Sequence, residues 1–162
     1  MLENNTIKIG LIPCAVGGTS IDLWFPGQYD RITKTYPYDA AIQRTKIAMQ
    51  YGVLKGILWH QGESDNTPQR AAHYLEKQIT VIRNFRRDLG IDVPFVLGEL
   101  GHFKEVQLIN KIIKDIPVLV PDTGLVTTEG LEDRGDKTHF DTRSARELGK
   151  RYAEILKKIT LK

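Results

Sequence analysis

The sequence predicts an α/β fold with a mainly parallel sheet and helices on both of its faces. Short apolar runs of strand length alternate along the chain with longer segments whose apolar residues recur at helical spacing. Polar clusters directly follow several of the predicted strands, where ligands bind in sheets of this kind. The length of 162 residues, with 41% hydrophobic and 27% charged residues, suits one globular domain spanning residues 1–162.

The N-terminal part of the chain contains two predicted strands and one predicted helix. Residues 7–16 form an apolar run that is expected to be a strand ending at the glycine pair that follows. Residues 40–51 are expected to form a helix, because a glycine follows them as an end signal. Residues 56–60 then predict a short buried strand.

The clearest helix is predicted over residues 68–89. Thr67 is suited to cap its start, Pro68 suits the first turn, and Gly90 suits the C-terminal cap. Apolar residues at three- and four-residue spacing form a single stripe along this helix, which predicts one buried face. The stripe consists of Ala72, Leu75, Ile79, Ile82 and Leu89.

The C-terminal part continues the alternation of strands and helices. Residues 94–100 predict a strand, residues 106–113 a helix, and residues 118–120 a short strand. Residues 143–159 predict a long final helix, and Ser144 with the glutamate three residues later fits a capping box at its start.

Composition and charge exclude several classes of function. The net charge is +3, but residues 134–162 hold nine Lys or Arg against four Asp or Glu, mostly on the polar face of one helix, so we expect no nucleic-acid partner. No apolar run is long enough to cross a membrane, and the first residues lack the pattern of a signal peptide. The single cysteine, Cys14, excludes an intrachain disulfide.

Three polar clusters follow three of the predicted strands. In the first, successive glycines let the backbone approach a ligand and point N–H groups at a developing negative charge, although a lone glycine pair also fits a plain turn. The third holds an acid and a histidine three residues apart, close enough for the carboxylate to orient the imidazole as in the second half of a Ser-His-Asp arrangement, although such a pair also arises by chance. The clusters are Gly17-Gly18-Thr19-Ser20, His60-Gln61-Gly62-Glu63-Ser64-Asp65 and Asp136-Lys137-Thr138-His139.

Other residues have both a functional and a structural interpretation. His60 and Glu63 are potential zinc ligands, but no His-Glu-x-x-His spacing is present, so neither a metal nor a cofactor is predicted. Trp24, with Phe25 and Tyr29, suits an apolar wall for a sugar ring, and core packing fits these aromatic residues equally well. Trp59 is expected in the core and His73 at the surface, and His102 fits either a cleft or a turn.

Together the three clusters resemble the SGNH-type carbohydrate esterases, in particular the sialate O-acetylesterase and acetylxylan esterase group (carbohydrate esterase family six). The resemblance rests on residues 13–21, 59–65 and 135–141, is most specific in Trp-His-Gln-Gly-Glu, and extends over nearly the whole chain. It implies a three-layer α/β/α sandwich with a flavodoxin-like sheet. It also implies a serine hydrolase that removes acetyl groups from sugars such as acetylxylan or sialic acid, without a metal or cofactor. Members of the family are often exported, and this sequence leaves the compartment open.

The resemblance also implies roles for individual residues. His139 would be the general base, Asp136 its orienting acid, and Gly18 and Gln61 the donors of the oxyanion hole. Lys137 stands where the family usually has glycine. The substrate-binding residues implied are Gly17, Thr19, Ser20, His60, Glu63 and Trp24.

The family's nucleophilic serine, in a Gly-Gln-Ser-Asn turn after its first strand, has no counterpart in this sequence. The chain is therefore expected to be N-terminally truncated, beginning at the family's second strand. The family's first strand, which lies between its second and third strands in the sheet, would then be missing. The alternatives are a carbohydrate-binding relic without catalysis, or Ser20 or Ser64 as the nucleophile. A phosphate or nucleotide binder at residues 17–20 is opposed by the absence of a Gly-Lys-Ser/Thr ending. We expect an acetylated carbohydrate as the partner and leave a homo-oligomer open, since it would cover strand edges exposed by the missing strand.

Overall fold

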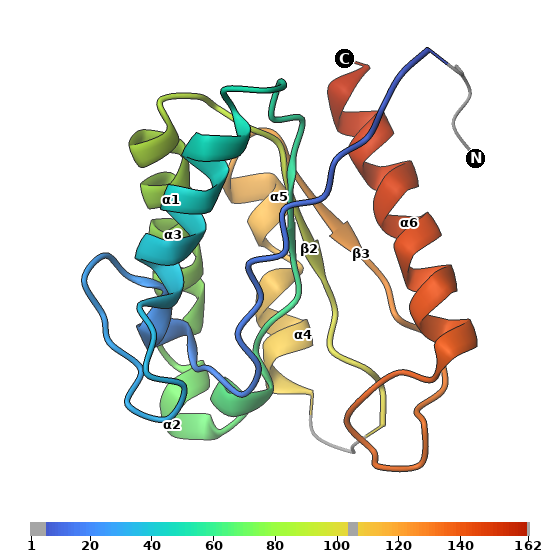
Figure 1. Cartoon of the computed structure of the whole chain (residues 1–162). Coiled ribbons are helices and arrows are strands. Elements are labelled where there is room, and N and C mark those ends of the chain that lie inside the picture. The colour runs from blue at the N-terminus through green and yellow to red at the C-terminus, as the bar shows by residue number, and fades with distance from the viewer. Residues whose placement is uncertain (1–5, 104–106, 162) are drawn as a thin grey trace.

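The sheet of this protein has three parallel strands, which the computed structural model shows between layers of helices (Figure 1). The structure describes residues 6–103 and 107–161. Strands β1 (Ile57–Trp59), β2 (Phe95–Gly98) and β3 (Thr123–Val126) lie in the order β1-β2-β3. The predicted α/β class with a parallel sheet is therefore confirmed.

Helices cover both faces of this sheet. Helices α1 (Pro37–Ala48), α3 (Tyr74–Leu89) and α4 (Leu108–Ile113) pack with Phe95 and Leu97 of β2 in the larger hydrophobic core. Val96, which alternates with them along the strand, packs on the opposite face against α6 (Thr142–Thr160). The shorter helices are η1 (Ile21–Trp24), η2 (Glu63–Asp65), α2 (Pro68–Ala71) and α5 (Ile116–Leu119).

Residues 7–16 do not form the predicted strand. Their alternating pattern survives only in part, because Cys14 and Val16 pack at the margin of the core while Ile9 and Leu11 are exposed. A strand needs a neighbour to complete its ladder of hydrogen bonds, and none of the described strands pairs with this segment. The outer edge of β1 is likewise unpaired within the described part of the chain, and Leu58 on that strand is 53% exposed.

The strand predicted at residues 118–120 is also wrong, because this segment ends helix α5 and leads to β3. A proline in the first turn of α5 favours the helix, and the left-handed Asp122 (φ 53°) turns the chain into β3. Strand β3 contains Gly124, which weakens its sequence signal. A Cβ on Gly124 would overlap Ile155 of α6, so this glycine allows the helix to approach the sheet closely.

The long helix predicted over residues 68–89 is divided into α2 and α3. Residue Thr67 precedes α2 without a capping hydrogen bond from its side chain, whereas Gly90 ends α3 in the predicted left-handed conformation (φ 71°). Ala72, which the predicted stripe placed inside, is exposed at the break, and His73 beside it is exposed as expected. The part of the predicted helix 106–113 that falls on residue 106 lies outside the described residues.

The final helix begins one residue earlier than predicted and has a different cap. Asp141 is its N-cap residue, and the Asp141 carboxylate accepts a hydrogen bond from the backbone N–H of Ser144 at 2.6 Å. Ser144 is therefore not the cap. Its buried hydroxyl accepts a hydrogen bond from the backbone N–H of Glu132 at 2.8 Å, which attaches the preceding loop to α6.

Candidate active site

The three polar clusters all lie on the side of the molecule where the strands end, at the bottom of Figure 1. Gln61, after β1, donates from Nε2 to the backbone carbonyl of Thr19 at 3.0 Å, and Ser64 donates to the carbonyl of Gly18 at 3.0 Å. Phe140, the residue that follows the third cluster, contacts the ring of His60 in the second cluster, with centroids 5.6 Å apart. The structure thus joins the first and second clusters by hydrogen bonds, and the loop of the third cluster packs beside the second through Phe140.

Asp136 and His139 form a hydrogen-bonded pair in the loop before α6. The Oδ2 atom of Asp136 lies 2.8 Å from Nδ1 of His139 and 2.7 Å from Nε of Arg134. The other carboxylate oxygen accepts the backbone N–H groups of Thr138 at 3.0 Å and of His139 at 2.8 Å. These hydrogen bonds, with those from His139 the largest cause, hold the pKa of Asp136 well below its usual range. An ionised carboxylate therefore orients the imidazole, and the side chain of His139 is 64% exposed.

The loop that presents this pair depends on two residues with positive φ. Gly135 has φ 100°, and Lys137 has φ 54°, in the left-handed region that favours glycine. The backbone N–H of Lys137 donates to the carboxylate of Asp133, which helps to hold this conformation. The lysine therefore occupies a position where glycine would be less strained, in agreement with the glycine that the family usually has there.

Gly18 lies in an exposed turn with φ 73° and presents its backbone to solvent. Within the described part of the chain, no acceptor takes the N–H of Gly18. A Cβ added to Gly17 or Gly18 would meet no atom within 4 Å, so the turn is open above both glycines. This geometry suits a donor to an external oxyanion, and the role stays a prediction.

Gln61 does not have the free donor that the predicted oxyanion role requires. Its side-chain nitrogen donates to the carbonyl of Thr19 and, at 2.7 Å, to Oδ2 of Asp65, which uses both amide hydrogens. Its side-chain oxygen accepts from the hydroxyl of Tyr74 at 2.9 Å. The oxyanion assignment of Gln61 is therefore corrected: in this structure the amide fastens the first cluster to the second.

Asp65 is central to this arrangement, although the sequence analysis gave it no role. It is only 1% exposed and accepts hydrogen bonds from Gln61 and, at 2.8 Å, from the backbone N–H of Ile21. The guanidinium of Arg70 lies 3.9 Å from its other oxygen. The sequence around Asp65 is polar and does not indicate that its carboxylate is buried. Only the fold shows that Asp65 joins the first and second clusters.

Trp24 and Thr19 belong to the interior instead of an open cleft. Trp24 is 6% exposed, and its ring packs edge-on against Trp59 with centroids 4.9 Å apart. Its indole nitrogen donates to the hydroxyl of Thr19 at 3.0 Å, and that hydroxyl donates to the carbonyl of Val16. Burial leaves the ring of Trp24 little surface for a sugar, so its substrate-binding assignment is corrected to one of support. Core packing of Trp59 is confirmed.

His60, the first residue of the second cluster, lies between Tyr152 of α6 and Glu63. Its Nδ1 lies 3.4 Å from the hydroxyl of Tyr152, which donates to the carbonyl of Trp59 at 2.8 Å, and its Nε2 lies 4.0 Å from Glu63. Burial lowers the pKa of His60, and the nearby carboxylate of Glu63 opposes this shift. Gly98 makes the arrangement possible, because a Cβ there would overlap the hydroxyl of Tyr152.

No nucleophile contacts His139 among the described residues. The chain contains three serines. The hydroxyl of Ser64 donates to Gly18, that of Ser144 is buried under Glu132, and Ser20 precedes η1 without capping it. None of the three hydroxyls is hydrogen-bonded to the imidazole. Within residues 6–103 and 107–161, no group of three or more His, Cys, Asp or Glu side chains is placed to hold a metal, and no helix is long and apolar enough to span a membrane.

Glu99, another buried carboxylate at this edge, was not anticipated from the sequence. It accepts hydrogen bonds from the Thr127 hydroxyl at 3.0 Å and the backbone N–H of Thr128 at 3.2 Å, and lies 3.3 Å from Nε2 of His102. It thereby connects the segments that follow β2 and β3. His102 is held in the turn after β2, and Phe103 beside it packs against Phe140.

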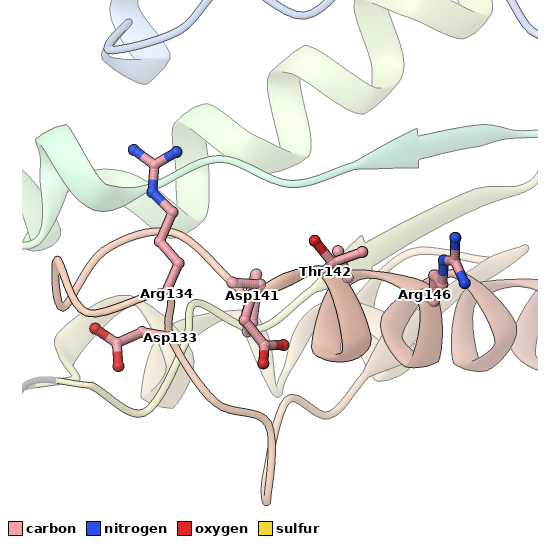
Figure 2. Close-up of a pocket in the computed structure, with 7 residues that line it drawn as sticks. Asp133, Arg134, Asp141, Thr142 and Arg146 are labelled. Atoms are coloured by element: carbon pink, nitrogen blue, oxygen red, sulfur yellow. The ribbon is translucent and has the colours of Figure 1, made fainter.

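A shallow hollow of about 810 Å³ lies between the loop that precedes α6 and the first turns of that helix (Figure 2). It adjoins the acid–histidine pair through Arg134, but neither Asp136 nor His139 lines it. The hollow therefore does not contain the acid–histidine pair, and this pair and the Gly17-Gly18 turn stay the predicted site. The residues of the hollow are Asp133, Arg134, Phe140, Asp141, Thr142, Ala145 and Arg146.

Comparisons with known proteins identify the family of this chain. Residues 1–158 match the family model described as carbohydrate esterase, sialic acid-specific acetylesterase. A protein of Arabidopsis thaliana named as a probable carbohydrate esterase is 29% identical to this chain over an alignment 163 residues long. The alignment covers 94% of this chain and 57% of that protein.

Solved structures show the same fold. The crystal structure of the Arabidopsis protein superposes with a TM-score of 0.84 at 27% identity and covers 97% of this chain and 63% of that one. A carbohydrate acetylesterase from Xanthomonas citri superposes with a TM-score of 0.67 at 23% identity over 88% of this chain and 35% of that one. The chain thus spans less than two thirds of the length of these relatives. With a family match over almost its whole length, the chain belongs to the SASA family of carbohydrate esterases.

Proposed function

We propose that this chain carries the acid–base half of a serine esterase that removes acetyl groups from carbohydrates such as acetylxylan or acetylated sialic acid. The observation that carries the proposal is the Asp136–His139 pair, with 2.8 Å between Oδ2 and Nδ1, at the edge of the sheet that also bears the Gly18 turn. Membership of the carbohydrate esterase family supports the same chemistry.

In this mechanism, His139 takes the proton of a serine hydroxyl while the serine oxygen attacks the acetyl carbonyl carbon. Asp136 keeps Nδ1 protonated, so that Nε2 is the base. The backbone N–H of Gly18 donates to the oxyanion that forms. The carbon–oxygen bond to the sugar breaks, and the sugar oxygen takes the proton from His139. A water then gives a proton to His139 and attacks the acyl-enzyme, which releases acetate and returns the proton to serine.

The nucleophile is the part of this mechanism that the described residues do not supply. We propose that it belongs to a segment outside this chain, since the relatives are longer and none of the three serines is hydrogen-bonded to His139. The same observation favours a second candidate, a carbohydrate-binding protein that lacks catalysis. A nucleophilic Ser64 would first have to release the carbonyl of Gly18.

Labelling with a fluorophosphonate, followed by intact-protein mass spectrometry, tests this assignment. The chain alone is expected to take up no adduct. The chain mixed with a peptide that carries a Gly-Gln-Ser-Asn turn is expected to release acetate from acetylated xylan or acetylated sialic acid and to place one adduct on the peptide. His139→Ala is expected to abolish both the acetate release and the adduct on the peptide. His73→Ala, on the exposed turn before α3, is expected to leave both unchanged.

An adduct on the chain alone would overturn the external nucleophile, and peptide mapping would then identify Ser20 or Ser64. A folded chain that gains no activity with the peptide, yet binds the acetylated sugar, would support the carbohydrate-binding alternative. Circular dichroism checks the fold of every variant, so that a loss of activity is not confused with unfolding.

A further inference from the structure

Two tyrosines between η1 and α1 form an exposed aromatic pair. The rings of Tyr29 and Tyr36 lie with centroids 4.9 Å apart and planes at 49°. Although each ring contacts the other, Tyr29 remains 44% exposed and Tyr36 49% exposed. The rings thus keep much of their surface in water, whereas Trp24, which precedes them in the sequence, is buried. The acid–base chemistry described above does not use them.

The loop that joins these tyrosines is held in one conformation. Asp30 accepts hydrogen bonds from the backbone N–H of Ile32 at 3.0 Å and from the hydroxyl of Thr33 at 2.6 Å. The backbones of Asp30 and Thr35 exchange two hydrogen bonds, at 2.8 and 3.3 Å. The two rings are therefore presented in advance on a closed loop, which reduces the entropy lost when a ligand binds.

A shallow, open groove lies beside the ring of Tyr36 and the first turns of α1. It has a volume of about 450 Å³ and is lined by Thr35, Tyr36, Asp39, Ala40 and Gln43. The groove thus combines one aromatic wall with hydroxyl, carboxylate and amide groups. An apolar ring face beside a few polar groups matches a sugar, whose C–H face packs on an aromatic ring while its hydroxyls form hydrogen bonds.

We propose that Tyr29, Tyr36 and the adjoining groove form a glycan subsite that binds a neutral sugar unit of a longer chain. The proposal rests on the proposed function for its choice of carbohydrate. The subsite adjoins α1, on the side of the molecule away from α6 and the loop of His139 (Figure 1), so a single sugar does not reach both places. The carboxylate of Asp39 in the groove disfavours an acidic sugar. The substrate is therefore an oligosaccharide or polysaccharide instead of a free monosaccharide.

Isothermal titration calorimetry of the whole chain with xylohexaose tests the subsite without requiring catalysis. Tyr36→Ala and Tyr29→Ala are each expected to weaken binding about tenfold, whereas Tyr36→Phe and Tyr29→Phe, which keep the rings, retain most of it. Tyr51→Ala is the matched control, because Tyr51 is 87% exposed and lies beyond the other end of α1. Binding of xylose is expected to be much weaker than that of xylohexaose.

Amide chemical-shift changes in the wild-type chain provide a second measurement that does not depend on the folding of a variant. Xylohexaose is expected to shift the signals of Thr35, Asp39 and Gln43. Absence of binding at millimolar xylohexaose, unchanged affinity in both alanine variants, or tighter binding of trisialic acid would overturn the neutral-glycan subsite. Because none of these measurements involves acetate release, failure of the subsite and failure of the esterase mechanism are distinguishable.

Discussion

The two halves of the region around the candidate site, the Asp136–His139 pair and the cluster of Gln61 and Asp65, are stabilised in different ways. The Asp136–His139 pair is exposed, and its hydrogen bonds all join residues within five positions of one another. The Gln61–Asp65 cluster is buried, and it connects to Thr19 and Ile21 across more than forty residues. The first half is thus a property of one loop, whereas the second is a property of the whole fold.

This difference shows which half can change without harm to the rest of the protein. Exposed hydrogen bonds to a charged carboxylate exchange with water, so their loss mainly disturbs local geometry. A buried carboxylate that accepts two hydrogen bonds has no water to replace them. We therefore expect substitutions in the cluster to act on stability and substitutions in the pair to act on chemistry.

The largest effect is expected from Asp65→Ala, which breaks the buried half. The backbone N–H of Ile21 and the amide of Gln61 lose their acceptor, which should lower the free energy of unfolding by about 3 kcal/mol. Urea denaturation followed by circular dichroism measures this loss. Asp22→Ala is the control, because it removes only an exposed pair with Lys77 and should cost less than about 1 kcal/mol. Equal losses in both variants would contradict the distinction.

A smaller, pH-dependent effect is expected at His60, which joins the two halves. Burial lowers the pKa of His60 in the folded state, so the unfolded chain binds more protons below its ordinary value near 6.5. The contribution of the neutral ring is therefore fully present above pH 6.5 and is lost as the pH falls below it.

The dependence of stability on pH between 7 and 5 measures this contribution. His60→Gln is expected to lose less stability than the wild type over that range, with His73→Gln as the reference for removal of one histidine. An unchanged slope in His60→Gln would show that this ring does not couple protonation to folding.

The smallest effect, Lys137→Gly, sharpens the exposed half of the comparison. Glycine relieves the left-handed conformation at φ 54° but adds entropy to the unfolded chain, so we expect a gain of less than about 1 kcal/mol. Thermal unfolding measures the change in stability, and the NMR signals of His139 report whether the loop keeps its conformation. A clear loss of stability would show that the lysine side chain contributes to the loop.

The sequence predicted those features whose causes are local. Gly90 as a helix end, the strands predicted at residues 56–60 and 94–100 and found as β1 and β2, and the spacing of Asp136 and His139 follow from a few neighbouring residues. Features that depend on distant partners were missed. Residues 7–16 have the pattern of a strand but no neighbour to pair with, and β3 contains a glycine whose purpose is the approach of α6.

The same reasoning explains the residues of the site. Nothing near Gln61 in the sequence indicates that its side-chain amide donates a hydrogen bond to the carbonyl of Thr19. Nothing near Trp24 indicates that its ring packs against Trp59. Tyr29 was considered for sugar binding from its place in the sequence, but neither its contact with Tyr36 nor the exposure of both rings could be predicted. Burial is a property of the assembled fold, so a polar or aromatic side chain shows its function only when its distant neighbours are known.

The contact of Tyr152 with the end of β1 has a consequence for the order of folding. Its hydroxyl reaches the carbonyl of Trp59 across 93 residues, through the space that Gly98 leaves open. During synthesis on the ribosome, β1 emerges long before α6 does. His60 therefore cannot reach its final position until the last helix has left the ribosome, and so many residues of separation make this closure a late and slow step.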